Sequence, residues 1–155
     1  MQILFRKSSD DRHGLAILRD GLPRDEVDCE TRSTLEHDLL HYAVETEARL
    51  TTGFWGNLAA GLTLAEMNDR TGAPLGAGAD EMATIEQIVG ALSGAVKGRS
   101  AAEMVAGMCR FAAALGATMP AWLTEPFIEA VQERMRQLLG RWRATPYGAT
   151  MDLPW

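Results

Sequence analysis

The chain has 155 residues, of which 46% are hydrophobic and 23% are charged, and its formal net charge is −6. This length and composition are typical of a single globular domain over residues 1–155 and argue against extensive disorder. The acidic balance disfavours a nucleic-acid backbone or an anionic membrane surface as the main partner. No signal-peptide pattern and no run of 18 apolar residues is present, so we expect a cytoplasmic protein without a membrane partner.

The cysteine content agrees with this expectation. Cys29 and Cys109 stand far apart in the chain and neither belongs to a CxxC pair. The sequence therefore indicates neither a zinc ribbon nor a redox motif. Two free thiols in a reducing compartment are the expected state, because disulfides are rare in the cytosol.

Both ends of the chain carry strand patterns. Residues 1–7 and 15–19 are apolar runs separated by the turn cluster Ser8–Gly14, which predicts a β-hairpin. Residues 27–30 add a weaker strand pattern. A two-stranded hairpin is only marginally stable alone, and the tail after Gly148 alternates apolar and polar residues. We therefore expect the tail to return and pair with the hairpin.

Helical patterns fill the region between these strands. Ser33 and Glu36 form a capping-box pattern that starts the first helix, and Gly53 is its predicted end. Ser100 and Glu103 repeat the capping-box pattern further along the chain. The later helices are predicted over residues 55–67, 81–97 and 100–115, and from Thr124 onward with Pro126 in the first turn.

Together these patterns predict an α+β fold. A small antiparallel sheet, made from the N-terminal hairpin and a C-terminal strand, packs against a cluster of four to five helices. Residues 68–79 are rich in Gly, Ala and Pro, and we interpret them as the surface loop best suited to mobility.

The first helix concentrates the side chains that are capable of chemistry. His37 and His41 are four residues apart, which places them on one side of the helix, at the border between its apolar and polar faces. Asp38, Glu45 and Arg49 fall on the polar face.

Two histidines at this spacing can hold one divalent metal ion such as zinc. The order His-Asp-x-x-His is similar to the H-E-x-x-H motif of zinc proteases, so Asp38 is the candidate general base or outer-shell group, although aspartate is one methylene shorter. A third ligand is needed. The candidates are Glu45 one turn further along the helix, Glu66 in the range used by the glutamate-ligand class of these proteases, and His13 in the hairpin turn.

A structural role explains the same histidines equally simply. Their rings would then hydrogen-bond to Glu45, to a backbone carbonyl or to water, and would help to hold the helix on the sheet. In that case the protein is a non-catalytic interaction protein for which a homodimer is an open alternative. The sequence leaves open whether the chain is an enzyme. Glu47 lies within the apolar arc, where it either interrupts the arc or lines a cleft.

The run LEHDLLHYAVE, followed by GFWGNLAAG, resembles a family of small bacterial proteins of unknown function that share an HDLxH-x-VVE helix and a GFWG segment. The N-terminal MQILFRK and the C-terminal WRATPYGATMDLPW fit the same pattern. The resemblance implies a bacterial origin. It also implies that the His37/Asp38/His41 helix and the Phe54-Trp55 pair are common to the members, but it brings no activity with it.

Overall fold

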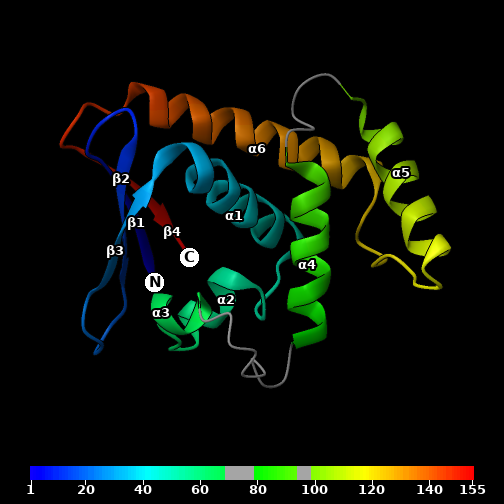
Figure 1. The fold of residues 1–155 in the computed structure, drawn as a ribbon, viewed down its shortest axis with the longest axis horizontal. Helices are drawn as coiled ribbons and strands as arrows, with labels where there is room; N and C mark the ends of the chain where they lie inside the picture. Colours follow the sequence, from blue (N-terminus) through cyan, green and yellow to red (C-terminus); the bar gives the residue numbers. More distant parts are fainter. Residues whose placement is uncertain (69–78, 94–98) are drawn as a thin grey trace.

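The computed structural model describes residues 1–68, 79–93 and 99–155. A four-stranded antiparallel sheet packs against helices, which confirms the predicted α+β class (Figure 1). The order of the strands in the sheet is β3-β2-β1-β4. Their bounds are Gln2–Lys7 for β1, Arg12–Leu18 for β2, Asp25–Glu30 for β3 and Thr150–Pro154 for β4.

The returning tail completes the sheet. As predicted, the tail pairs with the hairpin, and the structure shows that its partner is β1. The pairing is antiparallel, and Phe5 lies between Leu15 of β2 and Met151 of β4. Alternation along the strands directs one set of side chains into the core, where Phe5, Leu15 and Met151 are all buried. The alternate residues Arg6 and Asp152 are exposed. The hairpin thereby gains the additional strand and the covered face that it needs to be stable.

The helix α1 (Glu36–Ala48) runs through the centre of the molecule, and every residue from Leu39 to Glu45 is buried. It continues directly from a π-helical turn, η1 (Thr31–Leu35), and its N-cap residue Leu35 makes no side-chain capping bond to the described residues. The predicted capping box at Ser33 is therefore wrong, because the Ser33 hydroxyl instead donates to the backbone carbonyl and the carboxylate of Glu30.

The predicted end of this helix is also wrong. α1 ends at Ala48, and its C-cap residue Arg49 takes a left-handed φ of 54° that closes the last turn. Gly53 instead precedes α2 (Phe54–Ala59) as its N-cap residue. The helix predicted over residues 55–67 is in fact two helices, α2 and α3 (Leu64–Met67), because Gly61 takes a φ of +115° between them.

The remaining helices are α4 (Ala79–Leu92), α5 (Ala101–Ala114) and α6 (Glu125–Ala144). The capping box of Ser100 and Glu103 is formed at the start of α5, as predicted. α6 begins directly after Thr124 with Pro126 in its first turn, also as predicted, and the structure adds that the Thr124 side chain caps it. α6 lies along α1, where Nε of Arg134 donates to a carboxylate oxygen of Glu47 at 2.5 Å (Figure 1). The end of the helix predicted over 81–97 and most of the predicted loop 68–79 fall outside the described residues.

Two further expectations concern the whole chain. Both cysteines are free thiols, with Cys29 half-buried and Cys109 exposed. Across residues 1–68, 79–93 and 99–155, no helix combines the length and the apolar character that crossing a bilayer requires.

Candidate metal centre

The two histidines of α1 face a carboxylate that comes from α4. α1 and α4 lie side by side (Figure 1). The Nε2 atom of His41 is 3.3 Å from Oε1 of Glu86, and the Nε2 atom of His37 is 3.7 Å from Oε2 of the same side chain. The two imidazole rings are themselves 4.7 Å apart between centroids. The carboxylate of Glu86 is therefore approached by the Nε2 atom of both rings.

The opposite nitrogen of each ring also faces a carboxylate. Nδ1 of His37 is 3.4 Å from Oδ1 of Asp38, and Nδ1 of His41 is 3.1 Å from Oε1 of Glu45. Each imidazole thus lies between Glu86 on its Nε2 side and a carboxylate of its own on its Nδ1 side.

Exposure changes steeply across this group. The side chains of His41 and Glu45 are 1% and 0% exposed, whereas those of His37 and Glu86 are 44% and 45% exposed. The ring of Phe54, at the start of α2, lies 5.7 Å from the His41 ring on the buried side. The site therefore has a closed inner wall and an open side that solvent reaches.

The neighbouring carboxylates change the protonation equilibria of the group. Asp38, followed by Glu86, raises the pKa of His37 to about 9. Burial is the largest influence on His41 and lowers its pKa, but Glu45 and Glu86 together outweigh it, so the net shift in the pKa of His41 is upward. The two histidines hold the pKa of Glu86 well below its usual value. The group therefore attracts positive charge.

The spacing of these atoms suits one metal ion. One ligand atom each from His37, His41 and Glu86 lies within 4.8 Å of the others. Ligand atoms around a tetrahedral ion with bonds of about 2.1 Å are about 3.4 Å apart. The distances from His41 Nε2 to Oε1 of Glu86 and from His37 Nε2 to Oε2 of Glu86, 3.3 Å and 3.7 Å, are near that value, although they involve different oxygens of the carboxylate.

The carboxylates predicted from the sequence lie elsewhere. Asp38 and Glu45 contact the Nδ1 atoms of the two rings. They therefore lie on the opposite side of the rings from Glu86, and not where the two Nε2 atoms and Glu86 meet. Glu66 accepts hydrogen bonds from the backbone N–H and the hydroxyl of Thr63 in the capping box of α3. His13 is buried on the sheet against Phe5.

Glu86 was not among the predicted ligands. In the sequence it stands beside Gln87 in a helix whose apolar residues set the pattern, which is typical of a solvated helix face. Only the packing of α4 on α1 brings it to the histidines, and no local signal encodes that packing.

Comparisons of the chain with protein-family models, with curated proteins and with solved structures found no match.

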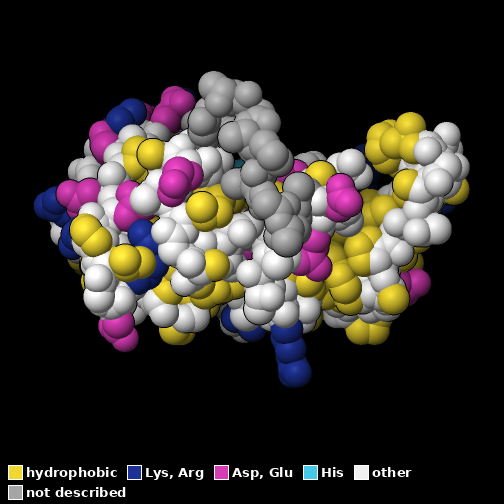
Figure 2. All heavy atoms as spheres, turned by 90° about the horizontal axis from the view of Figure 1, so that it is seen from below, with side chains coloured by type: hydrophobic (Ala, Val, Ile, Leu, Met, Phe, Trp, Pro, Cys, Tyr) yellow, Lys and Arg dark blue, Asp and Glu magenta, His cyan; other side chains and the backbone are white. Residues whose placement is uncertain are grey.

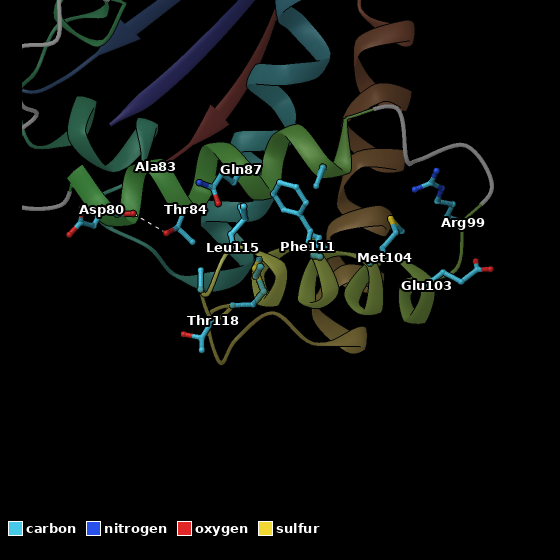
Figure 3. Close-up of a pocket in the computed structure, with 16 residues that line it drawn as sticks. Asp80, Ala83, Thr84, Gln87, Arg99, Glu103, Met104, Phe111, Leu115 and Thr118 are labelled. Carbon is cyan, nitrogen blue, oxygen red and sulfur yellow. Dashed lines mark hydrogen bonds between the residues drawn. The ribbon is translucent and has the colours of Figure 1, made fainter.

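A separate groove of about 740 Å³ lies between α4 and α5. Phe111 of α5 and Leu115, which directly follows α5, point toward α4, with Asp80 and Thr84 at one end and Arg99 near the other (Figure 3). Hydrophobic side chains gather at this end of the molecule (Figure 2). The side chains that line the groove include neither the two histidines of α1 nor Glu86, so the groove and the candidate metal centre are different sites.

Proposed function

We propose that His37, His41 and Glu86 bind one divalent metal ion. The observation that carries this proposal is the shared orientation of the two rings. Both Nε2 atoms approach Glu86, while both Nδ1 atoms approach other carboxylates. Histidine ligands of metals characteristically have this second partner, which fixes the ring and raises its basicity.

Zinc is the ion that we put first. Two histidines and one carboxylate form a common catalytic zinc set, with the fourth position left to water. The exposed side of the group, formed by His37 and Glu86, is where such a water would lie. A zinc-bound water is a nucleophile near neutral pH, so the proposed activity is hydrolase-like. Of the two roles expected for Asp38, we favour the outer-shell one, in which it orients His37, because its carboxylate faces the Nδ1 atom of that ring.

A second candidate function needs no metal. Glu86 also forms ion pairs with both histidines when these are protonated, which would join α4 to α1 in a purely structural role. The upward shift in the pKa of both histidines favours this alternative. Under it, the chain is an interaction protein. With either candidate we retain the cytoplasmic location and the lack of a nucleic-acid partner that the acidic composition favours.

Metal titration separates the two candidates. Tag-free protein is stripped with a chelator, and zinc binding is then measured by calorimetry and by elemental analysis after dialysis. The wild type is expected to bind one equivalent. His41→Ala and Glu86→Gln are each expected to weaken binding by more than the 10–100-fold that outer-shell changes cost, because each removes a direct ligand.

Glu81→Gln is the matched control, since Glu81 is an exposed carboxylate on the same helix as Glu86. Its zinc affinity should equal that of the wild type. If the wild type takes up no zinc, manganese or ferrous iron, or if Glu86→Gln binds zinc as tightly as Glu81→Gln, the metal proposal is lost and the structural alternative remains.

A further inference from the structure

Glu45 is a fully buried carboxylate whose oxygens accept hydrogen bonds from two different elements. Oε1 faces Nδ1 of His41 at 3.1 Å and accepts the backbone N–H of Phe54 at 2.9 Å. Oε2 accepts the backbone N–H groups of Trp55 at 3.0 Å and Gly56 at 3.4 Å. The first N–H groups of a helix have no partner within it, so Glu45 satisfies those of α2 while also holding a histidine of α1.

The start of α2 is shaped around this carboxylate. A Cβ atom at Gly53 would lie 2.3 Å from the Glu45 carboxyl group, and one at Gly56 would lie 2.3 Å from the backbone of Thr51. Any larger residue at position 53 would therefore displace the carboxylate. Nε1 of Trp55 donates to the backbone carbonyl of Asp38 at 3.3 Å, so this segment contacts α1 at a second point.

The consequence for His41 concerns which ring nitrogen carries the proton in the neutral imidazole. Glu45 and Glu86 compete for that proton from opposite sides of the ring. Glu45 is fully buried and its oxygen is 3.1 Å from Nδ1, whereas Glu86 is half exposed and 3.3 Å from Nε2, which has no assigned hydrogen-bond partner among the described residues. Hydrogen bonds to ionised groups strengthen where water is excluded, which favours the proton on Nδ1.

We propose that Glu45 is the positioning residue of the site, and that with the amides of α2 it fixes the Nδ1–H tautomer and the ring orientation of His41, so that Nε2 is free to bind the metal. This inference rests on the proposed metal site for its functional meaning. It also joins two parts of the sequence that had no evident connection, because the GFWG segment holds the glutamate at the end of the HDLLHYAVE helix.

Asp38 and Glu45, the two carboxylates at the Nδ1 atoms, should differ in how much they contribute to metal binding. Asp38 stands behind His37 as Glu45 stands behind His41, but the His37 ring is 44% exposed and its Nδ1 contact is longer, at 3.4 Å. Water can replace Asp38 at that position. We therefore expect Asp38→Asn to weaken metal binding less than Glu45→Gln does.

Two experiments test this inference. One measures zinc binding by the Glu45→Gln variant, and the other determines the His41 tautomer in the metal-free wild type. Glu45→Gln should bind zinc 10–100-fold more weakly at unchanged stoichiometry, which is the usual cost of losing such a partner. Glu66→Gln is the matched control, because Glu66 also accepts a backbone N–H at the start of a short helix but does not belong to the histidine group. Its affinity for zinc should stay at the wild-type value.

Long-range ¹H–¹⁵N spectra of the metal-free wild type, at a pH where the ring is neutral, should show His41 protonated at Nδ1. Protonation at Nε2, or wild-type zinc affinity in a folded Glu45→Gln protein, would overturn the inference. If the tautomer is as expected but the wild type binds no metal, the proposed function fails while the positioning of His41 by Glu45 holds.

Discussion

The free-energy cost of burying the His13 side chain depends on pH. Its side chain is fully buried, with the rings of Phe5 and Trp142 each 5.9 Å away. Nδ1 lies 3.3 Å from the hydroxyl of Thr31, and Nε2 has no hydrogen-bond partner within the described part of the chain. Such a site accepts the neutral ring more readily than the imidazolium ion.

The charged and titratable groups around His13 do not reverse this preference. Burial is the main cause of the lowered pKa of His13, the carboxylates of Asp38 and Asp28 partly oppose it, and Arg12 adds to it. Lys7 of β1 and the thiol of Cys29 of β3 stand opposite His13 in the sheet register. The pKa of His13 in the folded protein is therefore below its unfolded value of about 6.5.

This shift predicts a loss of stability in acid. Because the folded pKa is the lower one, neutral His13 contributes its full stability above about pH 6.5, and the contribution falls as the pH drops below that value. The difference in unfolding free energy between the wild type and His13→Gln should shrink between pH 7.5 and 5.5, by at most about 1.4 kcal/mol per pH unit. Urea denaturation at each pH measures it. A difference that grows on acidification would contradict the assignment.

Only some residues of the candidate site could be identified from the sequence. His37 and His41 were recognisable because their spacing alone puts them on one side of a helix. The sequence pattern puts Glu45 on the polar face of the helix, but α2 covers that side, and the carboxylate is buried against the first amides of α2. Glu86 comes from a distant helix, so its position depends entirely on how α4 packs.

At the scale of elements, a helix-capping pattern in the sequence gave a correct prediction where its residues hydrogen-bond to one another within a single turn. The capping boxes that begin with Ser100 and Thr63 are formed within their own turns, and the first was predicted. The pattern at Ser33 failed because Glu30 of the preceding strand accepts from its hydroxyl. Gly53 looked like a helix end, but its lack of a side chain serves the contact with Glu45.

The helix α5 has one apolar face that is only partly covered. Met104 and Met108 are buried, with 6% and 8% exposure, but Phe111 and Leu115 are 64% and 65% exposed along the groove that faces α4 (Figure 3). Apolar residues that are already in water gain little from folding.

Substitutions along this helix should therefore differ in cost by position. Phe111→Gln and Leu115→Gln are expected to change the unfolding free energy by less than about 0.5 kcal/mol, as surface changes do. Met104→Ala and Met108→Ala are expected to cost about 2 kcal/mol or more, because they leave cavities. Chemical denaturation of the four variants measures this. A cost for Phe111→Gln equal to that for Met108→Ala would show that the groove is covered in solution.

At the scale of the whole molecule, the sheet unites segments from both ends of the described chain. β4 and the hairpin enclose the same core as α1, since the hydroxyl of Tyr42 donates to the backbone carbonyl of Pro154 at 2.9 Å. This arrangement was predictable because the tail carried strand alternation and had no local partner.

A destabilising substitution in β4 should therefore lower the stability of the whole protein, and the sheet and the helices should still unfold together. Leu153 is 1% exposed, so Leu153→Ala is expected to cost about 2–5 kcal/mol. Asp152→Ala, at the neighbouring exposed position, should change stability by less than about 0.5 kcal/mol. Far-ultraviolet circular dichroism and tryptophan fluorescence should report coincident unfolding transitions for both variants. Separate transitions would show that the sheet and the helices unfold independently.

The position of Glu86 on α4, opposite two histidines of α1, has a consequence for the energetics of the protein. A cation held at that point would bind the folded chain more tightly than the unfolded one, because unfolding separates Glu86 from the two histidines. Binding of this kind stabilises the folded state by at most about 2.7 kcal/mol when the free ion is present at one hundred times its dissociation constant. The attachment of α4 to the central helix would then vary with the supply of metal in its surroundings, and starvation for that metal would shorten the lifetime of the protein.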